Sequence, residues 1–112
     1  MLAHLPDLLQ GTLDLLILKS LAPAPLHGWA ISKRIQQMSS DVLTVNQGSL
    51  YPALYRLEDR GWIKGRWVEK AGTRRRCYYR ITEPGRRVLA DQREDWSRFI
   101  AALGQVAGVK YA

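Results

Sequence analysis

The apolar positions near the start of the chain follow the spacing of a helix. Across residues 8–22, intervals of three and four residues separate the members of one apolar face, Leu9, Leu13, Leu16, Ile17 and Leu21. A second apolar face holds Leu8, Leu15, Leu18 and Ala22. Thr12 is a candidate local cap, and Pro23 and Pro25 end the helix. Because one small domain rarely covers both faces of a helix, we expect the second face at a subunit interface.

The pattern predicts a second helix from Gly28 to about Ser39, with Ile31, Ile35 and Met38 turned inward. His27, just before it, is expected to cap or to pack between helices. Residues 41–45 are short and β-branched, and they predict a brief extended connection.

A third helix is predicted to begin at Ser49, as its N-cap, and to end before Gly61. Pro52 then falls in the first turn, where its missing N–H costs little. The buried stripe of this helix is expected to be Leu50, Ala53, Leu54 and Leu57. The side chains left facing out are Gln47, Tyr51, Pro52, Tyr55 and Arg56.

Residues 62–69 and 76–82 alternate in polarity and predict two strands joined by a polar, glycine-containing tip. Cys77 is expected there as a small buried hydrophobe. Thr82 is the expected N-cap of a long last helix over residues 83–106. Its apolar arc contains Val88, Leu89, Trp96, Phe99, Ile100 and Leu103. Little of its own domain remains to cover this arc, so we expect it to pair with a second copy of the chain.

This order of elements is typical of a winged helix-turn-helix followed by a long helix. We therefore predict a mainly α fold with a small β-hairpin. Residues 1–82 are interpreted as a winged helix-turn-helix DNA-binding domain, and residues 83–112 as a C-terminal dimerisation helix.

Basic residues are concentrated in one third of the chain. The 112 residues are 46% hydrophobic and 24% charged, as in an ordinary globular domain, with a net charge of +7. Residues 56–87 hold eleven basic and four acidic residues, so that the rest of the chain is neutral. A basic segment beside a neutral scaffold indicates a surface for a polyanion. A solvated basic face kept for solubility is the alternative.

Other function classes find little support in the residues. The longest strongly apolar run, residues 15–18, is too short to span a membrane, and no secretory signal is visible. Cys77, the only cysteine, cannot form a zinc site with His4 and His27, so we expect no metal and no other cofactor. Without a glycine-rich phosphate loop or a nucleophile–base pair, an enzyme is not expected. A reduced, cytoplasmic setting is the expected one.

Several stretches resemble the PadR-like transcriptional regulators. The matching runs are residues 11–18, 25–31, 46–58, 61–63 and 76–85, and the most specific is Gly-Ser-Leu-Tyr-Pro-Ala-Leu at residues 48–54. Trp29 stands where the family usually has Tyr. A single helix after the hairpin resembles the family's compact subclass, and this resemblance implies a homodimer that pairs the last helix with its mate and with the first helix. The family default, repression, is likewise an implication of the resemblance.

The third helix is expected to enter the DNA major groove while the hairpin meets the backbone or the minor groove. The expected DNA contacts are Lys33, Asn46, Gln47, Ser49, Tyr51, Pro52, Tyr55, Arg56, Lys70, Thr73, Arg74, Arg75 and Arg76. The expected dimer interface comprises Leu8, Leu15, Leu18, Val88, Leu89, Trp96, Phe99, Ile100 and Leu103.

The expected partners are double-stranded DNA and a second copy of the chain. Trp96 packs in the dimer on one interpretation, and on another it is a flat wall for an aromatic or drug-like effector. A basic winged-helix module that binds RNA or protein is the alternative function, although A-form RNA keeps its major groove too deep and narrow for a helix.

Overall fold

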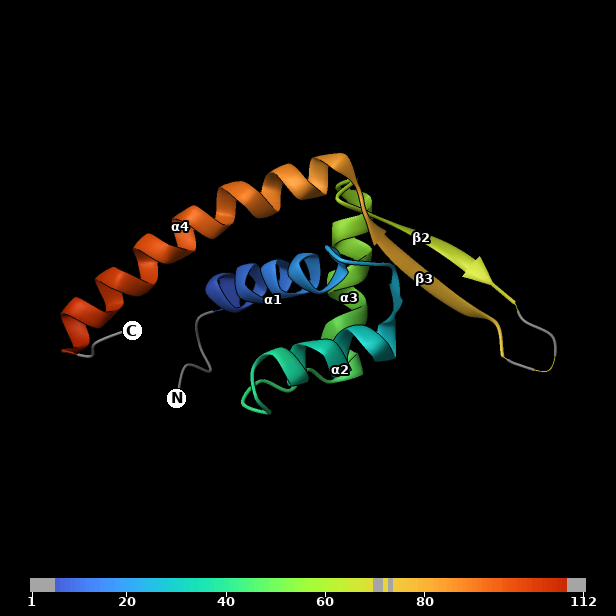
Figure 1. Cartoon of the computed structure of the whole chain (residues 1–112), viewed down its shortest axis with the longest axis horizontal. Helices are drawn as coiled ribbons and strands as arrows, with labels where there is room; N and C mark the ends of the chain where they lie inside the picture. The colour runs from blue at the N-terminus through green and yellow to red at the C-terminus, as the bar shows by residue number, and fades with distance from the viewer. Residues whose placement is uncertain (1–5, 70–71, 73, 109–112) are drawn as a thin grey trace.

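The computed structural model describes residues 6–69, 72 and 74–108, with only the backbone of residues 6–10. In chain order the elements are α1 (Pro6–Leu21), β1 (Leu26–His27), α2 (Gly28–Met38), α3 (Gln47–Asp59), β2 (Ile63–Val68), β3 (Arg76–Ile81) and α4 (Glu83–Ala107). Figure 1 shows α1, α2 and α3 as a central body, from which β2 and β3 project on one side, while α4 crosses above α1 toward the other. The molecule is therefore elongated, measuring 55 × 27 × 26 Å. The predicted fold class is confirmed.

The core lies where α1, α2 and α3 meet the sheet. Its fully buried aliphatic side chains are Ile17, Leu18, Leu21, Ile31, Ile35, Leu50, Leu54, Leu57 and Ile63. The assignment of Leu18 to a subunit interface was wrong, because this side chain is 0% exposed within a single chain. The reason is that α1 packs against α2, α3 and α4 at once, so its own chain covers much of both faces. Met38, expected inside, is 44% exposed.

Two predicted helix starts were also wrong. α1 is described from Pro6 onward, so Thr12 lies within the helix and not at its start. α3 is capped by Asn46 and not by Ser49, since the Asn46 Oδ1 accepts a hydrogen bond from the Ser49 backbone N–H at 2.8 Å. Pro52 consequently lies well inside α3. Gly61 follows the helix with a φ of 78°, as its predicted place past the end requires.

Within the described residues the sheet has three antiparallel strands in the order β1-β3-β2, one more than predicted. β2 and β3 form the expected hairpin, here called the wing, with Ile63 opposite Ile81 and Trp67 opposite Cys77. The additional strand, β1, pairs Leu26 with Tyr79. It joins the start of α2 to the wing. Residues 41–45, predicted as a brief extended connection, belong to no strand.

α4 begins as predicted, at a Thr82 N-cap whose Oγ1 accepts from the Gly85 N–H at 3.1 Å. Leu89, at 8% exposure, and the half-buried Val88 pack on the core of their own chain. The assignment of Leu89 to the dimer interface was therefore wrong. The later turns of α4 leave apolar side chains exposed, namely Phe99, Ile100, Leu103 and Val106. No helix in the described ranges is long and apolar enough to cross a membrane.

Candidate nucleic-acid interface

The first two turns of α3 form an exposed polar and aromatic surface. Its exposed residues are Asn46, Gln47, Ser49, Tyr51, Pro52 and Tyr55. Tyr51 lies tightly against the start of α2, where a Cβ added to Gly28 would be 2.7 Å from the Tyr51 hydroxyl. Glycine at position 28 thus leaves room for this ring at the beginning of α3. The sequence-predicted residues of the third helix, apart from Arg56, are brought together here.

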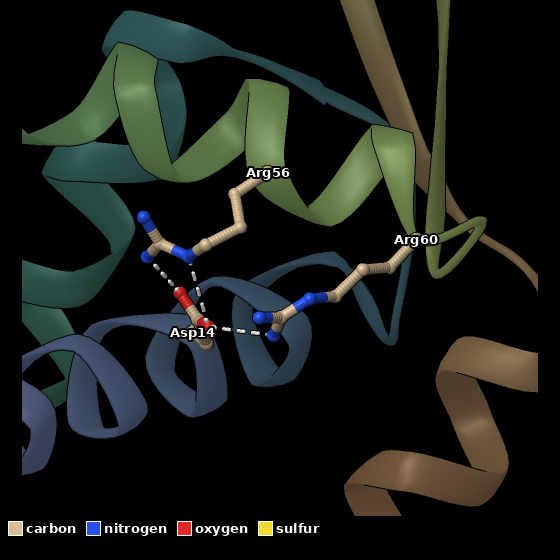
Figure 2. Close-up of polar contacts among 3 residues, drawn as sticks. All are labelled: Asp14, Arg56 and Arg60. Carbon is tan, nitrogen blue, oxygen red and sulfur yellow. Dashed lines mark hydrogen bonds and ion pairs between the residues drawn. The ribbon is translucent and has the colours of Figure 1, made fainter.

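Arg56 does not face outward as predicted. Figure 2 shows it directed from α3 toward α1, where it reaches Asp14. The Arg56 Nη2 donates to Asp14 Oδ1 at 2.5 Å and the Arg56 Nε to Oδ2 at 3.4 Å. Arg60 Nη1 lies 3.8 Å from the same carboxylate. The physical reason is that the Asp14 side chain is only 9% exposed, and a buried carboxylate requires paired cations.

A second carboxylate ties the other side of α3 to the wing. Glu58 Oε2 accepts a hydrogen bond from the Gly65 backbone N–H in β2 at 2.9 Å. Gly65 has no room for a side chain, because an added Cβ would be 2.8 Å from the Cys77 Sγ. Asp14 and Glu58 therefore hold α3 from its two flanks. Both contacts were missed from the sequence, although an aspartate within the leucine-rich first helix was a visible signal.

Toward its tip, the described part of the wing carries exposed Arg74, Arg75 and Arg76. Arg66 on β2 and Arg80 on β3 are exposed as well. The Arg75 guanidinium lies over the Trp67 ring, 4.9 Å from its centroid. The Arg76 Nη1 lies 3.1 Å from the His27 Nε2, so the wing and the start of α2 are close together at this point. The predicted contacts Lys70 and Thr73 lie outside the described residues, as does the side chain of Leu8, predicted in the dimer interface.

His27 caps α2, as expected. Its Nδ1 accepts from the Ala30 backbone N–H at 3.4 Å. Partial burial lowers the pKa of His27 below its ordinary value of 6.5, and the positive charge of Arg76 lowers this pKa further. The imidazole is therefore neutral at pH 7.

A groove of about 710 Å³ separates the wing from α2 and α3, and we call it the wing groove. Its aromatic lining comprises Trp29, Tyr51, Tyr55, Trp67 and Tyr79, and Arg74, Arg75 and Arg76 line it too. Burial, followed by a hydrogen bond with Cys77, raises the pKa of Tyr79, so its phenol stays protonated. Cys77 is half-buried in this lining and less enclosed than predicted. Aromatic faces and cations in one groove suit a nucleic-acid strand.

The predicted effector residue Trp96 lies on α4, away from the wing groove. It is half-buried and meets Phe99 edge to face, with ring centroids 5.6 Å apart. The partly covered Leu15 on α1 and Val88 on α4 pack against the core of the same chain. The predicted interface residues that remain exposed are Phe99, Ile100 and Leu103, which gather along the later turns of α4.

In comparisons with known proteins, residues 17–91 match the model of the transcriptional regulator PadR-like family. An uncharacterised protein from Lysinibacillus sphaericus is 28% identical over 91 residues, which cover 81% of this chain and 84% of that protein. A solved transcriptional regulator from Clostridium thermocellum is 30% identical, with a TM-score of 0.80, and the match covers 94% of this chain and 97% of that one.

One similar structure contains nucleic acid. Bacillus subtilis PadR in complex with operator DNA is 25% identical to this chain, with a TM-score of 0.66. The match covers 72% of this chain and 46% of the Bacillus protein.

Proposed function

Because the chain belongs to the PadR-like family of transcriptional regulators, we propose that it is a sequence-specific regulator that binds double-stranded DNA as a homodimer. The observation that carries this proposal is the exposed start of α3, capped by Asn46 and flanked by the arginines of the wing. The similarity to a family member crystallised with operator DNA supports the same ligand for this chain.

In this proposal the start of α3 reads bases and the wing binds phosphates. Gln47, Ser49 and Tyr51 lie on a rigid helix whose orientation is set by Asp14 and Glu58, so their side chains approach base edges at defined angles. Arg74 and Arg75 are exposed cations on the hairpin, suited to phosphate oxygens at any sequence. Lys33, Pro52 and Tyr55 are further proposed contacts on the same side. Arg56 is not among the proposed DNA contacts, because its guanidinium pairs with Asp14.

The finer parts of the proposal concern assembly and regulation. Two copies joined through α4 would present two copies of α3 to a palindromic operator, with half-sites about one helical turn apart, near 34–36 Å. Repression is the proposed outcome. An aromatic or planar cationic effector is proposed near Trp96. Its binding would quench tryptophan fluorescence in the wild type and in Trp62→Phe, whereas quenching that persists in Trp96→Ala would contradict this site.

The test is selection of bound sequences from a random duplex pool, followed by salt titrations on the selected duplex and on a scrambled one. Replacing Arg74 and Arg75 by Ala should weaken both interactions about equally and flatten the salt slope by roughly 4 for two residues in both subunits. Gln47→Ala should cost about 1–3 kcal/mol per base contact on the selected duplex and leave the salt slope nearly unchanged.

One control with RNA, and two outcomes of the experiments above, decide between this function and its alternatives. Duplex RNA of the selected sequence should bind no better than scrambled DNA, because its major groove excludes α3. A protein that enriches no sequence from the pool contradicts the proposed function. The two surfaces have been assigned in reverse if the arginine variants lose affinity only for the selected duplex while Gln47→Ala loses affinity equally for both duplexes.

A further inference from the structure

Two tryptophans on the wing-groove side of the molecule are too exposed to serve the core. Trp29 on α2 and Trp67 on β2 are each 59% exposed, and both line the wing groove. Leaving this much aromatic surface in water forfeits the free energy that burial would contribute. Their exposure therefore indicates a role other than packing.

Each of these rings carries a cation on its face. The Lys33 Nζ lies 5.3 Å from the centroid of Trp29, and the Arg75 Cζ lies 4.9 Å from that of Trp67. Among aromatic side chains tryptophan attracts cations most strongly, through the negative potential over its ring face. Exposed Lys and Arg side chains otherwise sample many rotamers, which must be restricted when they bind a phosphate. A ring beneath the cation restricts these rotamers before any phosphate binds.

Both rings stand on fixed backbone. Trp67 lies opposite Cys77 in the wing register, on a strand that Glu58 ties to α3. Trp29 lies in the first turn of α2, stacked on the capping imidazole of His27 with ring centroids 6.3 Å apart. The two cation–tryptophan pairs thus belong to different elements, while their rings line one groove.

We propose that Trp29 and Trp67 are positioning residues that hold Lys33 and Arg75 beside the wing groove, so that a nucleic-acid strand there meets two cations that are already ordered. This inference rests on the proposed function and adds a role for two residues to which that function assigns no contact. The proposed ligand of the wing groove follows from charge, because two cations beside aromatic faces suit the phosphates of a nucleic-acid strand.

The experiment is a double-mutant cycle on the selected duplex. Trp67→Leu should weaken binding about two- to fivefold per subunit, the range of an exposed cation–π pair, and leave the salt slope unchanged because the cation is retained. Trp67→Tyr should keep most of the affinity, since a ring face remains. In an Arg75→Ala background, Trp67→Leu should have no further effect.

The matched control removes a different exposed cation, Lys64, which lies on the same strand as Trp67. In a Lys64→Ala background, Trp67→Leu should show its full two- to fivefold effect. If Trp67→Leu lowers the thermal midpoint, the corresponding cycle with Trp29→Leu and Lys33→Ala tests the proposal on α2.

Two outcomes overturn the inference alone. They are wild-type affinity in Trp67→Leu, and additive losses from Trp67→Leu and Arg75→Ala, which would mean that the ring acts without the cation. A wild-type protein that binds no duplex overturns the proposed function, and this inference with it.

Discussion

At the scale of single residues, the orientation of α3 depends on one buried carboxylate. Asp14 accepts two hydrogen bonds from Arg56 and faces Arg60, all within the contact between α1 and α3 (Figure 2). A carboxylate at this depth is stable only while its charge is paired. Asp14 therefore links the first helix, which packs on α4, to the helix that we propose reads DNA.

Asp14→Asn should lower the free energy of unfolding by about 1–3 kcal/mol, because it leaves a partly buried Arg56 without its counter-charge. Urea denaturation measures this loss. The control is Asp95→Asn, which breaks the ion pair with Arg98 on α4, where both side chains are more than 70% exposed. That exposed pair should contribute less than about 0.5 kcal/mol. Equal losses in the two variants would show that burial of Asp14 does not matter.

The lowered pKa of His27 predicts the sign of a pH dependence of stability. Its pKa in the folded state lies below the ordinary value of 6.5, so below pH 6.5 the unfolded chain binds a proton that the folded chain resists. Stability should therefore be greatest above this range and fall as the pH drops from 6.5 toward the lowered pKa. His27→Asn should reduce the difference in urea midpoint between pH 7.5 and pH 5.5. A midpoint difference that is unchanged in His27→Asn would assign the pH dependence to other groups.

At the scale of elements, the sequence predicted what local pattern decides and missed what distant contacts decide. The long helices, the wing and the Thr82 cap follow from periodicity and capping chemistry. The start of α3 did not, because Asn46 and Ser49 are both good caps and lie three residues apart. β1 was not predicted, because a strand of two residues is too short to show an alternation of apolar and polar positions. Leu18 lies on an apolar face whose covering, by its own chain or by a partner, is fixed only by the tertiary fold.

The candidate site was likewise predicted in part, where local pattern decides it, and missed where distant contacts decide it. The exposed positions of α3 and the arginines of the wing follow from helical spacing and from a polar hairpin. The inward turn of Arg56 did not follow, because its partner lies 42 residues earlier in the chain. The wing groove depends on β1 bringing Trp29 toward the sheet, which no pattern local to Trp29 indicates.

Gly85 fixes the departure of α4 from the wing. A Cβ at this position would lie 2.0 Å from the backbone oxygen of Trp62, so Gly85→Ala must shift backbone at the joint. We expect a loss of about 1–3 kcal/mol in the free energy of unfolding. Gly11→Ala is the matched control, because Gly11 is also helical and an added Cβ meets nothing within 4 Å. This control should stabilise the protein by about 0.5–1 kcal/mol. Urea denaturation should show a lower free energy of unfolding for Gly85→Ala and a higher one for Gly11→Ala.

At the scale of the whole molecule, α4 extends beyond the body that it helps to cover. Its first turns pack Val88 and Leu89 on the core, whereas its later turns carry exposed Phe99, Ile100 and Leu103. Exposed apolar side chains gathered along one helix are typical of a protein–protein interface. A second copy of the chain would cover this surface, and the two-fold symmetry of such a pair matches the palindrome proposed for the operator.

The last prediction concerns this assembly. Ile100→Glu places a carboxylate within the proposed interface of each subunit, at a cost on the order of 3–5 kcal/mol if the charges are buried. We expect sedimentation at micromolar concentration to show dimers for the wild type and monomers for Ile100→Glu, with DNA affinity lost because each monomer meets one half-site. Ala101→Glu adds the same charge to the opposite side of α4, at an exposed position, and should remain dimeric. A monomeric wild type, or dissociation of both variants alike, would contradict assembly through this face of α4.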